Sequence, residues 1–293
     1  MSEEPYVNSP AFHSDEFPPS SPEHAAFHII PTPWEASVSY GGGARNGPNA
    51  ILAASVQLEA YLDGNIPGEV GIHTTPPVNC QGIASDIIDR IRFATAHSLA
   101  LNKLPILLGG EHSMTLGPVQ AIRDLQIPFG VVQFDAHADL RETYQDNPLS
   151  HACVMKRILD LDIPIFQIGV RSLAKEEVDI RTERSIPYLD AEEIARSGFP
   201  ETILPDDFPT NLFVTFDADV FDPSLIPDTG TPEPGGLDWY QAIEGLENAL
   251  KGRKVLGADF VELAPRPGKH ASDFVIAKLV YKFMDLVQKQ NAL

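Results

Sequence analysis

Short apolar runs alternate with amphipathic stretches along the chain from about residue 26 onward. Apolar residues at helical spacing predict helices over residues 85–101 and 272–288, and a glycine–proline start predicts another over residues 47–61. The short apolar runs predict buried strands at residues 26–30, 104–108, 129–134, 164–168, 212–216 and 254–261. Strands separated by helices of ten or more residues predict an α/β fold with helices on both faces of a mainly parallel sheet.

Polar side chains follow four of these predicted strands directly. The sequences Gly-Gly-Glu-His, Asp-Ala-His-Ala-Asp, Asp-Ala-Asp and Val-Glu come at the ends of the strands, and their chemically active members are His112, Asp135, His137, Asp139, Asp217, Asp219 and Glu262. Ligands of open parallel sheets bind beyond the carboxyl ends of the strands. We therefore expect these side chains to meet at one site.

The spacing of the acidic residues predicts a metal site. Asp135, His137 and Asp139 alternate after one strand, and alternate residues of an extended chain point to the same side. Asp217 and Asp219 repeat this spacing after another strand. Carboxylates packed so closely repel one another unless cations neutralise them. A single such pair would more often be a helix cap or a loop turn, but three clusters at three strand ends favour metal.

The number and kind of ligands indicate two ions. Bridging carboxylates allow two ions a short distance apart to share Asp135 and Asp217, and His112 supplies a further nitrogen. Oxygen-rich ligation with two imidazoles and no thiolate favours a harder ion than zinc, with manganese first. Paired metal ions activate water at neutral pH, so this site predicts a hydrolase.

Composition narrows the choice of partners. The chain has 293 residues, a formal charge of −20 and a pI of about 4.7. Such a field repels nucleic acid and anionic membranes, and it attracts metal ions and amine substrates, although an acidic surface can also serve solubility alone. Two cysteines are too few for a disulfide framework, and no apolar run reaches the length of a membrane span. Residues 1–25, acidic and proline-rich, do not resemble a leader, so we expect a cytoplasmic protein.

The same segment sets the expected domain organisation. Its prolines oppose regular helix, so residues 1–25 are predicted to lie extended over the surface or over a neighbouring subunit. Residues 26–293 contain no linker-like stretch, and we expect them to form a single catalytic domain.

Several motifs together resemble those of the ureohydrolases, the family of arginases, agmatinases and related guanidino-compound hydrolases. They occur in family order and cover most of the chain: residues 43–48, 109–113, 134–139, 150–151, 215–219, 222–223, 230–236 and 261–262. The resemblance implies a three-layer α/β/α sandwich and a binuclear manganese site. One ion would take His112, Asp135, Asp139 and Asp217, and the other Asp135, His137, Asp217 and Asp219. Members of the family usually assemble as trimers or hexamers, so a homo-oligomer is expected.

The resemblance also implies roles in catalysis. A metal-bridging hydroxide would attack the guanidinium carbon, and Asp139 would accept the remaining proton. His151 resembles the family's proton-transfer histidine, although by itself it could be a loop histidine at a helix start. Glu262 matches the glutamate that pairs with the substrate guanidinium, although by itself it could form a structural ion pair.

The loop after Asp139 bears on the substrate. Arginases typically have Asn two residues beyond this Asp, and here that position is Arg141. The segments 139–141 and 150–157 are similar to those of prokaryotic agmatinases, which predicts hydrolysis of agmatine to urea and putrescine, a step of polyamine biosynthesis. Arg141 would favour a carboxylate-tailed substrate such as guanidinobutyrate if it faced the cleft, but a pairing with a local acid is expected. The loop acids Glu142 and Asp146 could attract a distal ammonium.

Two alternatives lie outside this interpretation. A deacetylase-type metal amidohydrolase would share the broad fold, but the complete pairs of ligands favour two ions over one. A catalytically silent assembly or regulatory protein would not need every ligand position to be present.

Overall fold

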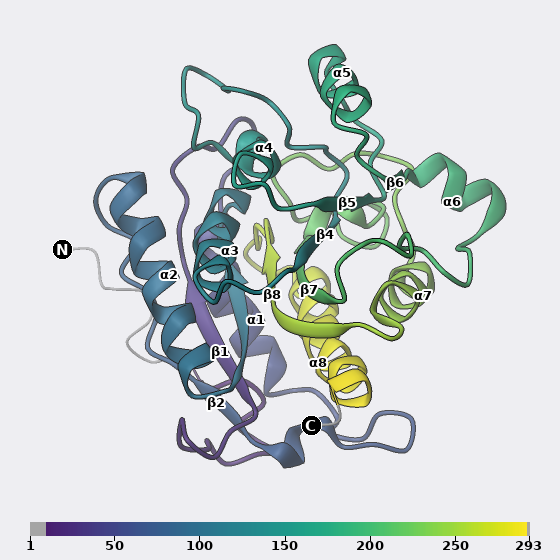
Figure 1. Ribbon diagram of the computed structural model, residues 1–293. Helices are drawn as coiled ribbons and strands as arrows, with labels where there is room; N and C mark the ends of the chain where they lie inside the picture. Colours follow the sequence, from purple (N-terminus) through teal and green to yellow (C-terminus); the bar gives the residue numbers. More distant parts are fainter. Residues whose placement is uncertain (1–9, 292–293) are drawn as a thin grey trace.

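The strands form one parallel sheet. The structure is a computed structural model that describes residues 10–291 (Figure 1). Its strands are β1 (Phe27–Thr32), β2 (Ile72–Thr74), β3 (Leu104–Gly109), β4 (Gly130–Phe134), β5 (Ile165–Ile168), β6 (Tyr188–Leu189), β7 (Asn211–Asp217) and β8 (Lys254–Val261). They lie in the order β2-β1-β3-β8-β7-β4-β5-β6, and every neighbouring pair is parallel. The six predicted strands are confirmed, and the edge strands β2 and β6 are too short to form a recognisable apolar run.

Helices connect these strands. They are α1 (Gly47–Ser55), α2 (Ala84–Ala100), α3 (Leu116–Arg123), α4 (Val154–Leu159), α5 (Lys175–Glu183), α6 (Ala191–Ser197), α7 (Trp239–Leu250) and α8 (Ala271–Asn291). The first helix ends at Ser55 and not near residue 61. The Ser55 hydroxyl donates to the carbonyl of Leu52 and accepts the amide of His13, which are alternatives to a further helical turn. Within residues 10–291, no helix is both long and apolar enough to cross a membrane.

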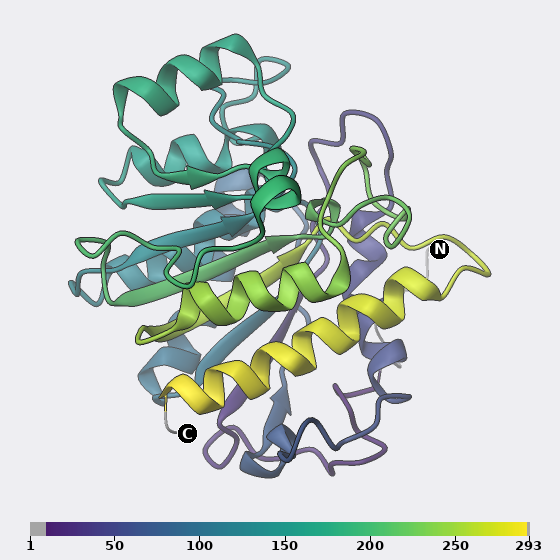
Figure 2. The same cartoon turned by 90° about the vertical axis from the view of Figure 1, so that its right-hand side faces the viewer.

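The helices cover both faces of the sheet, which confirms the predicted α/β/α sandwich. One hydrophobic cluster joins α1, α7 and α8 to one face, and a second joins α2, α3 and α4 to the other. Figure 2 shows α7 and α8 side by side on one face. Alternate residues of β4 supply the two clusters, Val132 and Phe134 to the first and Val131 to the second, because successive side chains of a strand point to opposite faces.

The described part of the N-terminal segment differs from the expectation of an extended surface stretch. Residues 12–16 form turns, and Phe12 and His13 are buried. The His13 ring packs edge-on against Phe17 and Tyr281, with ring centroids 5.0 and 4.6 Å away. Burial removes the apolar surface of these aromatic side chains from water, and this stabilises the packing of the segment against the core. Residues 1–9 lie outside the described part of the chain, and the division into residues 1–25 and 26–293 stays a prediction.

Candidate active site

The candidate site residues lie at the ends of four neighbouring strands at the centre of the sheet. The strands β3, β8, β7 and β4 are adjacent, and all four are parallel. His112 follows β3, Glu262 follows β8, Asp217 ends β7 and Asp135 follows β4. The carboxyl ends of these strands therefore meet at one edge, and residues far apart in sequence converge there.

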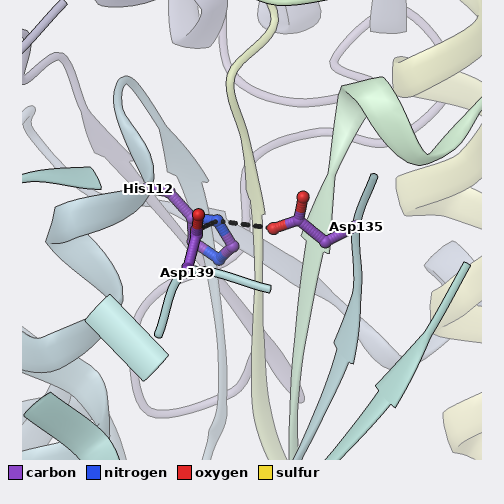
Figure 3. Close-up of side chains that lie close together, drawn as sticks. All are labelled: His112, Asp135 and Asp139. Atoms are coloured by element: carbon purple, nitrogen blue, oxygen red, sulfur yellow. Dashed lines mark ion pairs between the residues drawn. The ribbon is translucent and has the colours of Figure 1, made fainter. Parts of the chain in front are cut away.

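His112 is the centre of a first group of candidate ligands. Its Nδ1 lies 3.0 Å from Oδ2 of Asp135, 3.0 Å from Oδ2 of Asp139 and 3.4 Å from Oδ2 of Asp217. Figure 3 shows the His112 ring with the carboxylates of Asp135 and Asp139 beside it. Nε2 of His112 lies 2.8 Å from the Thr215 hydroxyl. A proton on Nε2 would be shared with Thr215, which leaves the Nδ1 lone pair facing the carboxylates.

A second group comprises Asp135, His137 and Asp219, whose ligand atoms all lie within 4.8 Å of one another. Nδ1 of His137 lies 3.0 Å from Oδ2 of Asp219 and 3.6 Å from Oδ1 of Asp135. Asp135 thus belongs to both groups, with one oxygen toward each imidazole. The structure brings together all six residues that the sequence suggested as ligands.

The donor set fits divalent cations. Burial and the charge of Asp135 raise the pKa of Asp139 to about 7. Burial, together with the charges of Asp219 and Asp135, raises the pKa of Asp217 well above its usual range. Among the described residues, Nδ1 of His112 also has no hydrogen-bond partner of good geometry. Cations between the imidazoles and carboxylates would remove both the repulsion and the unpaired nitrogen.

Backbone conformation contributes to this arrangement. Asp139 and Glu262 have positive φ angles of 53° and 61°, in the left-handed region that few residues other than glycine adopt. Gly110 precedes the His112 turn, and a Cβ there would lie 1.8 Å from the carbonyl oxygen of Trp34. Only glycine therefore allows the loop around Trp34 to pack this closely against the turn that carries His112.

His151 lies at the cleft beside a hydrogen-bonded pair that carries no signal in the sequence. Nδ1 of His151 lies 3.1 Å from the Ser37 hydroxyl, and that hydroxyl donates to Oε1 of Glu111 at 3.0 Å. A hydroxyl that donates to Glu111 can accept a hydrogen bond from the Nδ1–H of His151, and in the neutral ring this leaves Nε2 unprotonated. Burial lowers the pKa of His151, so the ring favours its neutral form. Ser37 carried no sequence signal because it lies 114 residues from His151.

Arg171 is a second residue that the sequence did not reveal. Its guanidinium donates to six backbone carbonyls, those of Gly169, Asp219, Val220, Phe221, Glu233 and Pro234. Three loops at the site are thereby joined, including the one that carries Asp219. A Cβ at Gly236 would lie 2.6 Å from Nη2 of Arg171, so glycine is needed there for the guanidinium to fit. The acceptors are backbone atoms, so no partner side chain marks the contact in the sequence.

Glu262 forms part of the cleft wall next to His112. Its Oε1 accepts the amide of His112 at 2.6 Å, and its side chain is half-buried. Burial and the nearby charge of Glu111 raise the pKa of Glu262 to about 8. Ser39, Tyr40 and Thr231 line the same cleft. A guanidinium bound here would place a cation beside this carboxyl and favour its ionised form.

The cleft continues past Asp139 and His151 to a chamber lined by Arg141 and Tyr144. Arg141 Nη1 lies 3.2 Å from Glu176, and the guanidinium lies 5.3 Å from the Tyr144 ring centroid. Arg141 therefore faces this chamber and, as predicted, pairs with a local acid. Glu142 does not line the chamber, because it pairs with Lys156 and Arg157 at 2.9 and 2.7 Å. The suggestion that Glu142 attracts a substrate ammonium is not supported.

Comparison with known proteins assigns the chain to a family. Residues 25–285 match the arginase family. The N(1)-aminopropylagmatine ureohydrolase of Synechocystis sp. is 38% identical over 89% of this chain and 88% of its own length. The agmatinase of Pyrococcus horikoshii is 35% identical over 91% of this chain and 93% of its own. The crystal structure of agmatine ureohydrolase of Thermoplasma volcanium superposes with a TM-score of 0.85 at 28% identity, covering 97% of this chain and 96% of that one. The chain therefore belongs to the arginase family and is a ureohydrolase of that family.

Proposed function

We propose that the enzyme hydrolyses the guanidinium group of agmatine to urea and putrescine, and that it uses two Mn²⁺ ions. The observation that carries the proposal is the pair of carboxylate–imidazole groups that share Asp135 beside the half-buried carboxyl of Glu262. His112, Asp135, Asp139 and Asp217 would hold one ion, and Asp135, His137, Asp217 and Asp219 the other. Oxygen-rich ligation with two imidazoles favours manganese.

The protein groups would divide the remaining work. Two bound divalent ions lower the pKa of water and so supply a nucleophile at neutral pH. Glu262 would accept two parallel hydrogen bonds from the guanidinium and hold its carbon in place. Asp139 would accept a proton during the attack, and His151, unprotonated at Nε2 before the reaction, would take up that proton and pass it to the departing amine. The contact between Ser37 and Nδ1 supports this role of His151, because a proton held at Nδ1 keeps the lone pair of Nε2 available.

A second candidate substrate is N(1)-aminopropylagmatine. Four relatives that carry this name are 37–38% identical to the chain, slightly more than the agmatinase of Pyrococcus horikoshii. The chamber beyond His151 offers space for a tail longer than that of agmatine. Guanidinobutyrate is less favoured, because the charge of Arg141 is already paired with Glu176.

Urea release from the manganese-loaded enzyme tests the proposal. Agmatine, N(1)-aminopropylagmatine, arginine and guanidinobutyrate are compared at equal concentration, with Asp135→Asn as the inactive control. The highest kcat/KM is expected for agmatine. A higher kcat/KM for N(1)-aminopropylagmatine would identify that compound, and not agmatine, as the preferred substrate. Arg141→Gln should leave agmatine turnover largely unchanged. A selective loss of guanidinobutyrate turnover in this variant would show that Arg141 binds a carboxylate.

Three further features remain predictions from the sequence. Elemental analysis should find two manganese ions per chain, and a single zinc ion would contradict the metal assignment. Light scattering should give the mass of a trimer or a hexamer. Fractionation of cells should recover the enzyme in the cytoplasm.

A further inference from the structure

A row of buried polar side chains leads from α5 to Asp135. Arg181 on α5 donates through Nε to Oε1 of Gln167 at 2.7 Å. Nε2 of Gln167 donates to Oε1 of Gln133 at 2.6 Å, and Nε2 of Gln133 donates to Oδ2 of Asp135 at 2.8 Å. Gln133 and Gln167 lie opposite each other on β4 and β5, and both are fully buried. Three hydrogen bonds in sequence therefore connect a buried arginine to the carboxylate shared by both candidate ligand groups.

The direction of these bonds is determined by the arginine. A guanidinium can only donate, so the oxygen of Gln167 must face Arg181 and its nitrogen must face Gln133. The second N–H of Gln167 reaches the carbonyl of Ala138 at 2.7 Å, so both its donors have acceptors. Gln133 must then accept through its oxygen, and its nitrogen faces Asp135. If either amide were turned around, two donors or two acceptors would face each other in the protein interior.

The far end of the row orients the Asp135 carboxylate. Oδ2 receives the bond from Gln133 and lies 3.0 Å from Nδ1 of His112. Oδ1 receives the amide of His137 at 2.6 Å and lies 3.6 Å from Nδ1 of that residue. Each oxygen is thus held by its own donor and is directed to its own imidazole. Rotation of the carboxylate would break both bonds and end the sharing between the two groups.

Stability alone does not account for these amides. A buried amide costs free energy unless all its groups are paired, and an apolar side chain at the same place has no such requirement. Their neighbours on β4 and β5, such as Val132 and Phe166, are apolar. The charge of Arg181 is itself compensated, by Asp190 at 3.0 and 3.1 Å and by the Tyr188 ring 4.4 Å away. A row of fully paired amides that ends on one carboxylate indicates a role at that carboxylate.

We propose that Arg181, Gln167 and Gln133 form a one-directional chain of donors that orients Asp135 for metal binding, with Arg181 as its remote positioning residue. The inference rests on the proposed function, because it assigns Asp135 to both metal ions. Residues that orient metal ligands typically change metal affinity about 10- to 100-fold. Loss of Arg181 would remove the donor to Oε1 of Gln167 and leave only the acceptors to oppose turning of the amides, so the donor on Asp135 would be less firmly held.

The test measures Mn²⁺ affinity and stoichiometry by calorimetry on the metal-free full-length chain. Arg181→Met and Gln133→Met are each expected to weaken binding about 10- to 100-fold. The double variant should be no weaker than Gln133→Met alone, because both changes break the same chain. Arg184→Met removes an exposed arginine just beyond α5 and is the matched control, with unchanged affinity expected.

The outcomes separate this inference from the proposed function. A wild-type chain that binds no divalent ion would refute the metal site itself. Two ions in wild type with unchanged affinity in Arg181→Met, or losses that multiply in the double variant, would overturn the donor chain alone. Urea denaturation of the metal-free proteins checks folding. If Arg181→Met does not fold, Gln167→Met replaces it, since this change breaks the chain and keeps the ion pair of Arg181 with Asp190.

Discussion

Replacing Arg171 by methionine should be among the most destabilising single changes near the site. The five N–H groups of its guanidinium serve six buried or loop carbonyls at 2.7 to 3.3 Å. A net contribution of about 1 kcal/mol for each of the five donors gives a total of about 5 kcal/mol. Water can enter and satisfy some of the exposed carbonyls, so we expect a loss of about 3–4 kcal/mol. Arg171→Lys keeps a charge and three donors on one nitrogen, and it should lose about half as much.

Urea denaturation of the metal-free chain measures this change in the free energy of unfolding. Arg184→Met, at an exposed arginine, should change it by less than about 0.5 kcal/mol. A loss below about 1 kcal/mol for Arg171→Met would refute the reasoning, because it would mean that the carbonyls do not depend on the guanidinium. Equal losses of unfolding free energy for the methionine and lysine variants would show that the planar geometry of the guanidinium has no importance.

Three further changes test other parts of the site and the core. Asp217→Asn should weaken Mn²⁺ binding by more than about 100-fold in calorimetry. Asp222 accepts hydrogen bonds from the amides of Gly235 and Gly236, and Asp222→Asn is the control, for which the Mn²⁺ affinity should stay within about threefold of wild type. Glu262→Gln should lower kcat/KM about 10- to 100-fold with metal content unchanged, since a charged hydrogen bond is lost; an unaltered kcat/KM would contradict its contact with the guanidinium. Burial lowers the pKa of His13 from 6.5, so the unfolded chain binds a proton there more readily and stability falls as the pH drops below about 6.5. His13→Phe should reduce this fall between pH 7.5 and 5.5 in urea denaturation, and identical pH curves for both proteins would be the opposite result.

Much of the fold could be predicted because strand and helix patterns are local. The apolar runs of β3, β4, β7 and β8 end at or just before polar residues, and each run can be recognised without knowledge of its neighbours. The edge strands β2 and β6 have three and two residues, too few to show such a pattern. The burial of Phe12 and His13 was missed because it depends on Tyr281, at the other end of the chain.

The candidate ligands were accessible from the sequence for a similar reason. Asp135, His137 and Asp139 lie within five residues, and their types and spacing already indicate metal chemistry. The residues that hold them in place were not accessible. Ser37 reaches His151 across 114 residues, and the hydrogen bonds of Arg171 within residues 10–291 go to backbone carbonyls.

The sequence alone therefore determined the strand order along the chain, the residue types at the strand ends and their chemistry. Only the tertiary structure decided that β3, β8, β7 and β4 are neighbours, because strand pairing depends on contacts between distant segments. That pairing places His112 3.0 Å from Asp135 and directs Gln133 to the same carboxylate. Local pattern specifies which groups are present, and long-range packing specifies which of them meet.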